Sequence, residues 1–248
     1  MTSANTSSRT KNGRRRDGRP LVALTIASGV VAGTAIGAGG AVLLQKPAGP
    51  CRNHPVGRET AQSWTVPQVS PAGMVWRDYH GVLLPHSVDG PWRTEHRLAS
   101  GFARTPRGAL LAAVHIAVRA NAQWGPKVFE PTIGKQVTGP DTDALLASAR
   151  DLYAKHRSRT ADGAALGRAY VVLEGFRWQG FSPQTASVDV VSAGPGDSDV
   201  TVKAVTRIQL QWQDGDWRVV APAGGSWGGA AAAIDSLDGY TRFPNGGG

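Results

Sequence analysis

The chain has 248 residues and a formal net charge of +9, but much of this charge lies at one end. Residues 1–20 carry six Arg or Lys side chains against one acid, Asp17, a net +5, which leaves +4 for the remainder. The basic balance therefore does not indicate a nucleic-acid-binding surface, and we expect no direct contact with nucleic acid. The single cysteine, Cys51, excludes an intramolecular disulfide framework and a multi-cysteine zinc site.

Residues 21–44 form an apolar segment without charge or proline. Its 24 residues exceed the roughly 20 that a helix needs to cross a bilayer core. Because basic flanks stay cytoplasmic, the sequence predicts a cytoplasmic tail (1–20), one transmembrane helix (21–44) and an extracytoplasmic remainder. A cleaved signal peptide has the same order of charge and hydrophobicity and is the alternative. The length of the apolar run and the lack of an A-x-A site directly after it favour the retained anchor.

Small residues recur at every fourth position of the predicted span, at Gly29, Gly33, Gly37 and Ala41. Four residues advance a helix by about 400°, so these positions form one slowly drifting stripe. Such a stripe lets two helix backbones approach closely in lipid. We therefore expect this face to contact another membrane subunit or a second copy of the chain, with chance spacing in an Ala/Gly-rich segment as the alternative.

Three helices are expected after a polar, proline-punctuated stalk at residues 45–70. Thr105 followed by Pro106 is typical of a helix start, and nine of the ten residues from Ala109 to Val118 are apolar, which predicts a buried helix. A short second helix or turn, interrupted by Pro131, is expected around residues 128–133. A third begins after Gly139-Pro140-Asp141 and places Leu145 and Leu152 on one face.

Strands are expected beyond Gly163. Apolar and polar side chains alternate from Val200 to Trp212, and Asp214-Gly215 is typical of a two-residue hairpin turn before a returning strand. Helices followed by an antiparallel meander predict an α+β domain over residues 71–222, with helices packed on a curved antiparallel sheet, and a Gly/Ala-rich tail over 223–248. We expect these residues to be buried together: Leu110, Val114, Leu145, Leu152, Ile208 and Leu210.

This order of elements, with its last hairpin at residues 207–220, resembles the cystatin-like, nuclear-transport-factor-like fold. A narrower resemblance rests on three stretches, Gly101-Phe102-Ala103-Arg104-Thr105-Pro106 with its continuation to Ala113, residues 119–122, and Phe129-Glu130-Pro131-Thr132-Ile133. These stretches resemble a family of actinobacterial membrane-anchored proteins associated with integrative and conjugative elements. The layout is similar to that of the scaffold proteins of type IV secretion systems. The resemblance implies no catalytic residues, and it implies other membrane subunits of a transfer complex, or a homo-oligomer, as partners.

Enzymatic alternatives rest on weak signals. Residues 224–228 match G-x-S-x-G around Ser226, but no histidine follows His156 to complete a hydrolase triad. The histidines form no tight ligand pair, and Arg107, Arg119 and Arg177 are expected on solvated faces. We therefore expect neither catalysis nor a metal or cofactor, and predict a membrane-anchored assembly component. A small-ligand-binding protein or pocket enzyme on the same fold is the alternative, with His115, Tyr153 and Glu174 lining the pocket.

Overall fold

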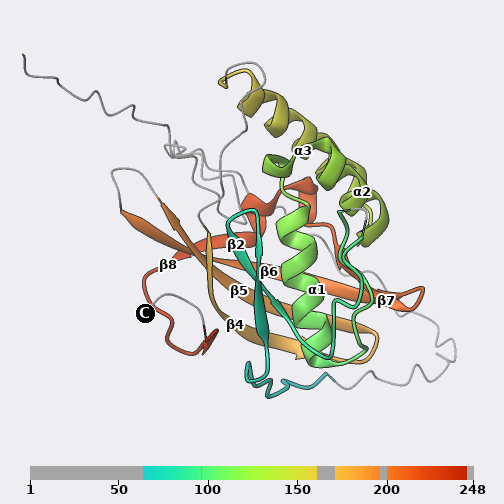
Figure 1. Cartoon of the computed structure of the whole chain (residues 1–248), viewed down its shortest axis with the longest axis vertical. Helices are drawn as coiled ribbons and strands as arrows, with labels where there is room; N and C mark the ends of the chain where they lie inside the picture. Colours follow the sequence, from blue (N-terminus) through green and yellow to red (C-terminus); the bar gives the residue numbers. More distant parts are fainter. Residues whose placement is uncertain (1–63, 96, 161–170, 196–199, 245–248) are drawn as a thin grey trace, which may run out of the picture.

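The computed structural model describes residues 64–95, 97–160, 171–195 and 200–244. The predicted cytoplasmic tail, the transmembrane segment and its face of small residues lie outside this part of the chain. Within the described residues, no helix combines the length and apolar character needed to cross a bilayer. The described residues form a mixed α+β fold with a curved sheet, as the sequence predicts (Figure 1).

Among the residues that the structure describes, seven strands make the main sheet, in the order β3-β7-β6-β5-β4-β9, with β8 also paired to β6. The neighbouring strands are antiparallel except for β3 and β7, which are parallel. The predicted hairpin joins β6 to β7, and positive φ angles of 50° at Asp214 and 81° at Gly215 fit a two-residue turn. The strands are β3 (Val137–Thr138), β4 (Val172–Phe181), β5 (Thr185–Pro195), β6 (Thr201–Gln213), β7 (Asp216–Val220), β8 (Ala231–Ile234) and β9 (Thr241–Arg242).

In the described part of the chain, three α-helices accompany the sheet: α1 (Pro106–Arg119), α2 (Pro126–Gln136) and α3 (Thr142–Arg157). The start predicted for α1 is confirmed, because the Thr105 hydroxyl accepts a hydrogen bond from Gly108 N at 3.0 Å. Short 3-10 helices occur at η1 (Ala122–Trp124), η3 (Ala223–Gly225) and η4 (Trp227–Ala230).

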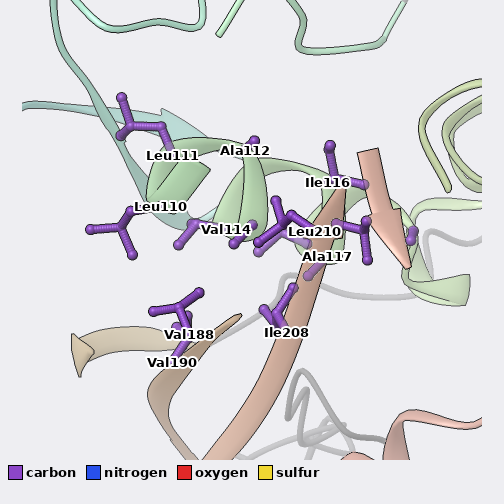
Figure 2. Packing of buried hydrophobic residues seen from close by; sticks show 14 of the residues in the cluster. Leu110, Leu111, Ala112, Val114, Ile116, Ala117, Val188, Val190, Ile208 and Leu210 are labelled. Carbon is purple, nitrogen blue, oxygen red and sulfur yellow. The ribbon is translucent and has the colours of Figure 1, made fainter. Parts of the chain in front are cut away.

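Helix α1 lies between the sheet and a separate hairpin of β1 (Val75–Tyr79) and β2 (Val82–His86). This position explains why every residue of the helix from Gly108 to Arg119 is buried. Figure 2 shows its side chains meeting those of β5 and β6. The predicted core is confirmed: the residues buried together include Leu110, Val114, Leu145, Ile208 and Leu210, with Leu152 half-buried against them.

Residues before position 71 and after position 222, outside the predicted domain, also pair with strands of the sheet. Thr65, in the expected stalk, exchanges backbone hydrogen bonds of 3.0 and 2.8 Å with Phe181 at the end of β4. In the expected C-terminal tail, β8 pairs with β6 and β9 pairs with β4. Both flanks therefore contribute to the sheet.

Candidate functional site

The space between α1 and the sheet is filled by aliphatic side chains. Val114 and Ile116 of α1 and Val188, Val190 and Ile208 of the sheet are all fully buried (Figure 2). A ligand chamber at this position would require these side chains to move. Open cavities lie instead on the opposite face of the sheet and on the far side of α1.

Three charged side chains form a row across the opposite face of the sheet. Arg177 of β4 is paired in register with Asp189 of β5, which is paired with Arg207 of β6. Because side chains alternate along a strand, Asp189 points away from α1 while its neighbours Val188 and Val190 point toward it. The register of the three strands thus places the acidic side chain of Asp189 between the basic side chains of Arg177 and Arg207.

The carboxylate of Asp189 is buried and saturated with hydrogen bonds. It accepts from Arg207 Nε at 2.8 Å and Nη2 at 3.2 Å, from Arg177 Nη2 at 3.1 Å and from Gln179 Nε2 at 2.7 Å. The hydrogen bonds and charge of Asp189 raise the pKa of Arg207 above its ordinary value. Two guanidinium groups against one carboxylate leave a net positive charge, fixed in position on an exposed face.

A cleft of about 480 Å³ opens beside this row. On one edge of β6, β7 pairs with residues 210–213 and β8 with residues 203–206. Between them, residues 207–209 have no ladder partner on this edge among the described strands. The chain between β7 and β8 lies beside this gap, with η3 packed against α3 and η4 against β6. We name this surface the β6 cleft; its polar wall is Arg177, Asp189, Arg207 and Gln209, and its apolar wall includes Val220, Pro222 and Trp227.

The three residues of the predicted pocket have separate partners. His115 is fully buried in α1, and its Nε2 donates to the carbonyl of Pro85 at 2.8 Å, while burial lowers its pKa well below the ordinary value. The ring of Tyr153 lies 6.1 Å from that of Phe129. The carboxylate of Glu174, on the outer face of β4, accepts from Lys203 Nζ at 2.8 Å.

The G-x-S-x-G segment does not have the geometry of a hydrolase elbow. Ser226 lies between η3 and η4 instead of between a core strand and an α-helix, and its hydroxyl accepts a hydrogen bond from Gly228 N at 3.3 Å. Among the described residues, no group of three or more His, Cys, Asp or Glu side chains is arranged to hold a metal ion.

The expectation that Arg119 lies on a solvated face is wrong. Arg119 is 4% exposed, because the β1–β2 hairpin covers the side of α1 that faces away from the sheet. Sequence reasoning also missed the row around Asp189. Its signal was that Asp189, between Val188 and Val190, is the one charged residue in the segment 185–195.

The described residues define an α+β domain with a filled core and an open, partly basic cleft on the outer face of its sheet. The chain belongs to the family described as a domain of unknown function (DUF8175), whose model matches residues 38–242. No curated protein and no solved structure matches the chain.

Proposed function

We propose that this chain is a single-pass membrane protein with a cytoplasmic N-terminus and an extracytoplasmic domain. This domain acts by protein–protein contact, as an assembly component of a conjugation-type (type IV) secretion apparatus. Its fold would be of the cystatin-like, nuclear-transport-factor-like kind. The charge order of residues 1–44 supports the topology. The proposed partners are other membrane subunits of the transfer complex and a second copy of the chain.

The β6 cleft is the observation that carries this proposal. It is open to solvent, and it combines a rigid pair of arginines with an apolar wall that includes Trp227. Arginine and aromatic side chains are enriched where protein partners bind. The filled core supports surface contact over pocket chemistry, since aliphatic side chains occupy the space between helix and sheet.

Topology is tested in whole cells with a membrane-impermeant thiol reagent. With Cys51 replaced by Ser, a Val88→Cys variant presents a thiol at a position that is 84% exposed. We expect labelling of intact cells. Labelling only after lysis would reverse the orientation, and a shortened product in the medium would indicate a cleaved signal peptide.

Assembly is tested by placing a photo-crosslinking amino acid at Gln209, which lines the β6 cleft, in cells that carry the transfer apparatus. The matched position is Lys135, an exposed residue of α2. We expect crosslinks to a membrane subunit of the apparatus, or to a second copy, from position 209 alone. Equal products from both positions would remove the cleft from the mechanism.

The predicted helix face has its own test. Gly33→Leu should weaken recovery of the complex, because close backbone contact is lost, while Val31→Leu, on another face, should leave it unchanged. Equal recovery of both variants would leave assembly to the outer domain.

A further inference from the structure

Arg119, at the C-terminal end of α1, is a buried cation that has no acidic partner in the described part of the chain. Its Nη1 contacts Nδ1 of His115 at 2.9 Å and the His115 carbonyl at 3.2 Å, and its guanidinium carbon lies 4.2 Å from the ring centre of Tyr79. Among the described residues, no carboxylate forms an ion pair with it. Buried charges in proteins are ordinarily paired, because an isolated charge in a low-dielectric interior is costly.

His115 does not supply the missing negative charge. Its Nε2 carries a proton, which it donates to the Pro85 carbonyl, so Nδ1 is the acceptor for Arg119 and the ring is neutral. Burial and the charge of Arg119 keep the pKa of this imidazole well below its usual range. Burial also lowers the pKa of Arg119 to about 10, which leaves the guanidinium charged at neutral pH.

Arg119 forms one wall of a pocket of about 210 Å³ beneath the β1–β2 hairpin. Arg77 and Arg97 also line this pocket, and neither forms an ion pair in the described part of the chain. The single acid of the lining, Asp78, accepts the backbone N–H of Gly81 at 3.0 Å and so closes the hairpin turn. Three arginines against one carboxylate give the lining a formal charge of +2.

Two buried polar atoms of residues that line this pocket, Nε of Arg119 and the hydroxyl of Tyr79, have no hydrogen-bond partner among the residues that the structure describes. Burial raises the pKa of Tyr79, so the hydroxyl keeps its proton and remains a donor. His86, the remaining titratable group of the lining, is neutral at pH 7, because burial and the neighbouring arginines lower its pKa to about 4. The lining of the pocket therefore combines a net positive charge with two donors, Arg119 Nε and the Tyr79 hydroxyl, that no described residue satisfies.

We propose that this pocket, which we name the Arg119 pocket, binds a small dianionic oxyanion. The volume fits a group with a few heavy atoms, such as a phosphate or a short dicarboxylate. Guanidinium groups recognise both through paired N–H donors. The charge of +2 favours two negative charges over one. Bound there, the anion would compensate Arg119 and bridge the hairpin to the loop that carries Arg97.

Binding is measured by isothermal titration calorimetry on the full-length chain in a nonionic detergent at pH 7. The probes are inorganic phosphate, succinate and acetate. We expect saturable binding of phosphate or succinate at least tenfold tighter than that of acetate. Preference for phosphate would indicate a phosphate-bearing ligand, and preference for succinate a carboxylate ligand. The absence of saturable binding of both dianions would overturn the proposal and make Arg119 a purely structural residue.

The variants are chosen so that folding is preserved. Arg77→Gln and Arg97→Gln alter exposed side chains at the pocket, and each should weaken binding by about tenfold. Arg93→Gln is the matched control, since Arg93 is exposed in the same loop but does not line the pocket. Equal affinity of all three variants would overturn the proposal.

A second readout reports on Arg119 itself. Its Nε–H is shielded from solvent, so it should give a slowly exchanging ¹⁵N resonance. Phosphate or succinate should shift this resonance in the wild type and in Arg93→Gln, with the same saturation curve as the calorimetry. A resonance that stays fixed while heat is released would place the anion elsewhere. These experiments use the purified chain alone, so their outcome is separate from that of the crosslinking experiments.

Discussion

Replacing Leu210 by Ala tests the contact between helix and sheet on which the fold depends. Leu210 lies in β6, is 1% exposed, pairs across the sheet with Val219 and Ala186, and faces α1 (Figure 2). The substitution removes three carbon atoms, which corresponds to about 2.4 kcal/mol of lost transfer free energy at about 0.8 kcal/mol per methylene. The cavity left behind adds to this loss, so we expect the free energy of unfolding to fall by about 3–4 kcal/mol.

The assay is thermal unfolding of the full-length chain in nonionic detergent, followed by the near-ultraviolet circular dichroism of its tryptophans. A domain of this size loses roughly 2–4 °C of Tm for each kcal/mol, so the expected shift is about 6–16 °C. Leu83→Ala is the control, because Leu83 is 44% exposed in β2 and should shift Tm by only a few degrees. Equal shifts for the two variants would refute the packing of α1 against β6.

Three further predictions use the same unfolding assay. Asp189→Asn should lower the free energy of unfolding by about 1–3 kcal/mol, since it removes the buried charge that fixes two arginines. Asp235→Asn, at an exposed site, should leave the free energy of unfolding unchanged. Gly225→Ala should lower the free energy of unfolding more than Gly224→Ala does. Both glycines have positive φ, but of the two only Gly225 is so placed that a Cβ would overlap backbone atoms, those of Ala144 and Leu145. Equal losses for the two variants would contradict this. Stability should fall as the pH drops from about 6.5 toward 5. Folding lowers the pKa of His86 from about 6.5 to about 4 and that of His115 well below 6.5, so the unfolded chain binds more protons in this range; a flat profile would contradict both shifts.

Local signals in the sequence were sufficient for the central elements. The start of α1 follows from Thr105 and Pro106, whose cap and fixed φ act within one helical turn. The strand β6 follows from its alternation, and the turn to β7 from Asp214-Gly215. In each case the physical cause lies within a few residues of its effect, so no knowledge of the tertiary structure was needed.

The flanking strands could not be predicted in this way. Residues 231–234 read Ala-Ala-Ala-Ile, which has no alternation and little β-propensity, and they become β8 only because the edge of β6 is available to pair with them. Thr65 likewise gains its structure from Phe181, a residue 116 positions away. Pairing over such distances is determined by the tertiary fold, and a window of sequence does not contain it.

Arg119 shows a different limit of prediction from the sequence. The apolar run of α1 predicts a helix that is buried on most sides, and this should have extended to the arginine one residue beyond the run. The expectation of a solvated face followed the average behaviour of arginine instead of the particular helix. The hairpin that covers Arg119 and contributes Tyr79 comes from an irregular, aromatic stretch whose strands were not predicted.

The two charged sites of the domain differ in how their charges are compensated. Asp189 is a buried anion with two cations and an amide around it, and every interaction that it requires comes from the chain itself. Arg119 is a buried cation whose neighbours are a neutral imidazole, a carbonyl and an aromatic face, and two further arginines add to its charge. The first arrangement is complete without a ligand, which fits a rigid surface for a protein partner. The second has no counter-charge among the described residues. The free-energy cost of this uncompensated charge would be relieved by the anion that we propose to bind there, and this relief would add to the anion's affinity.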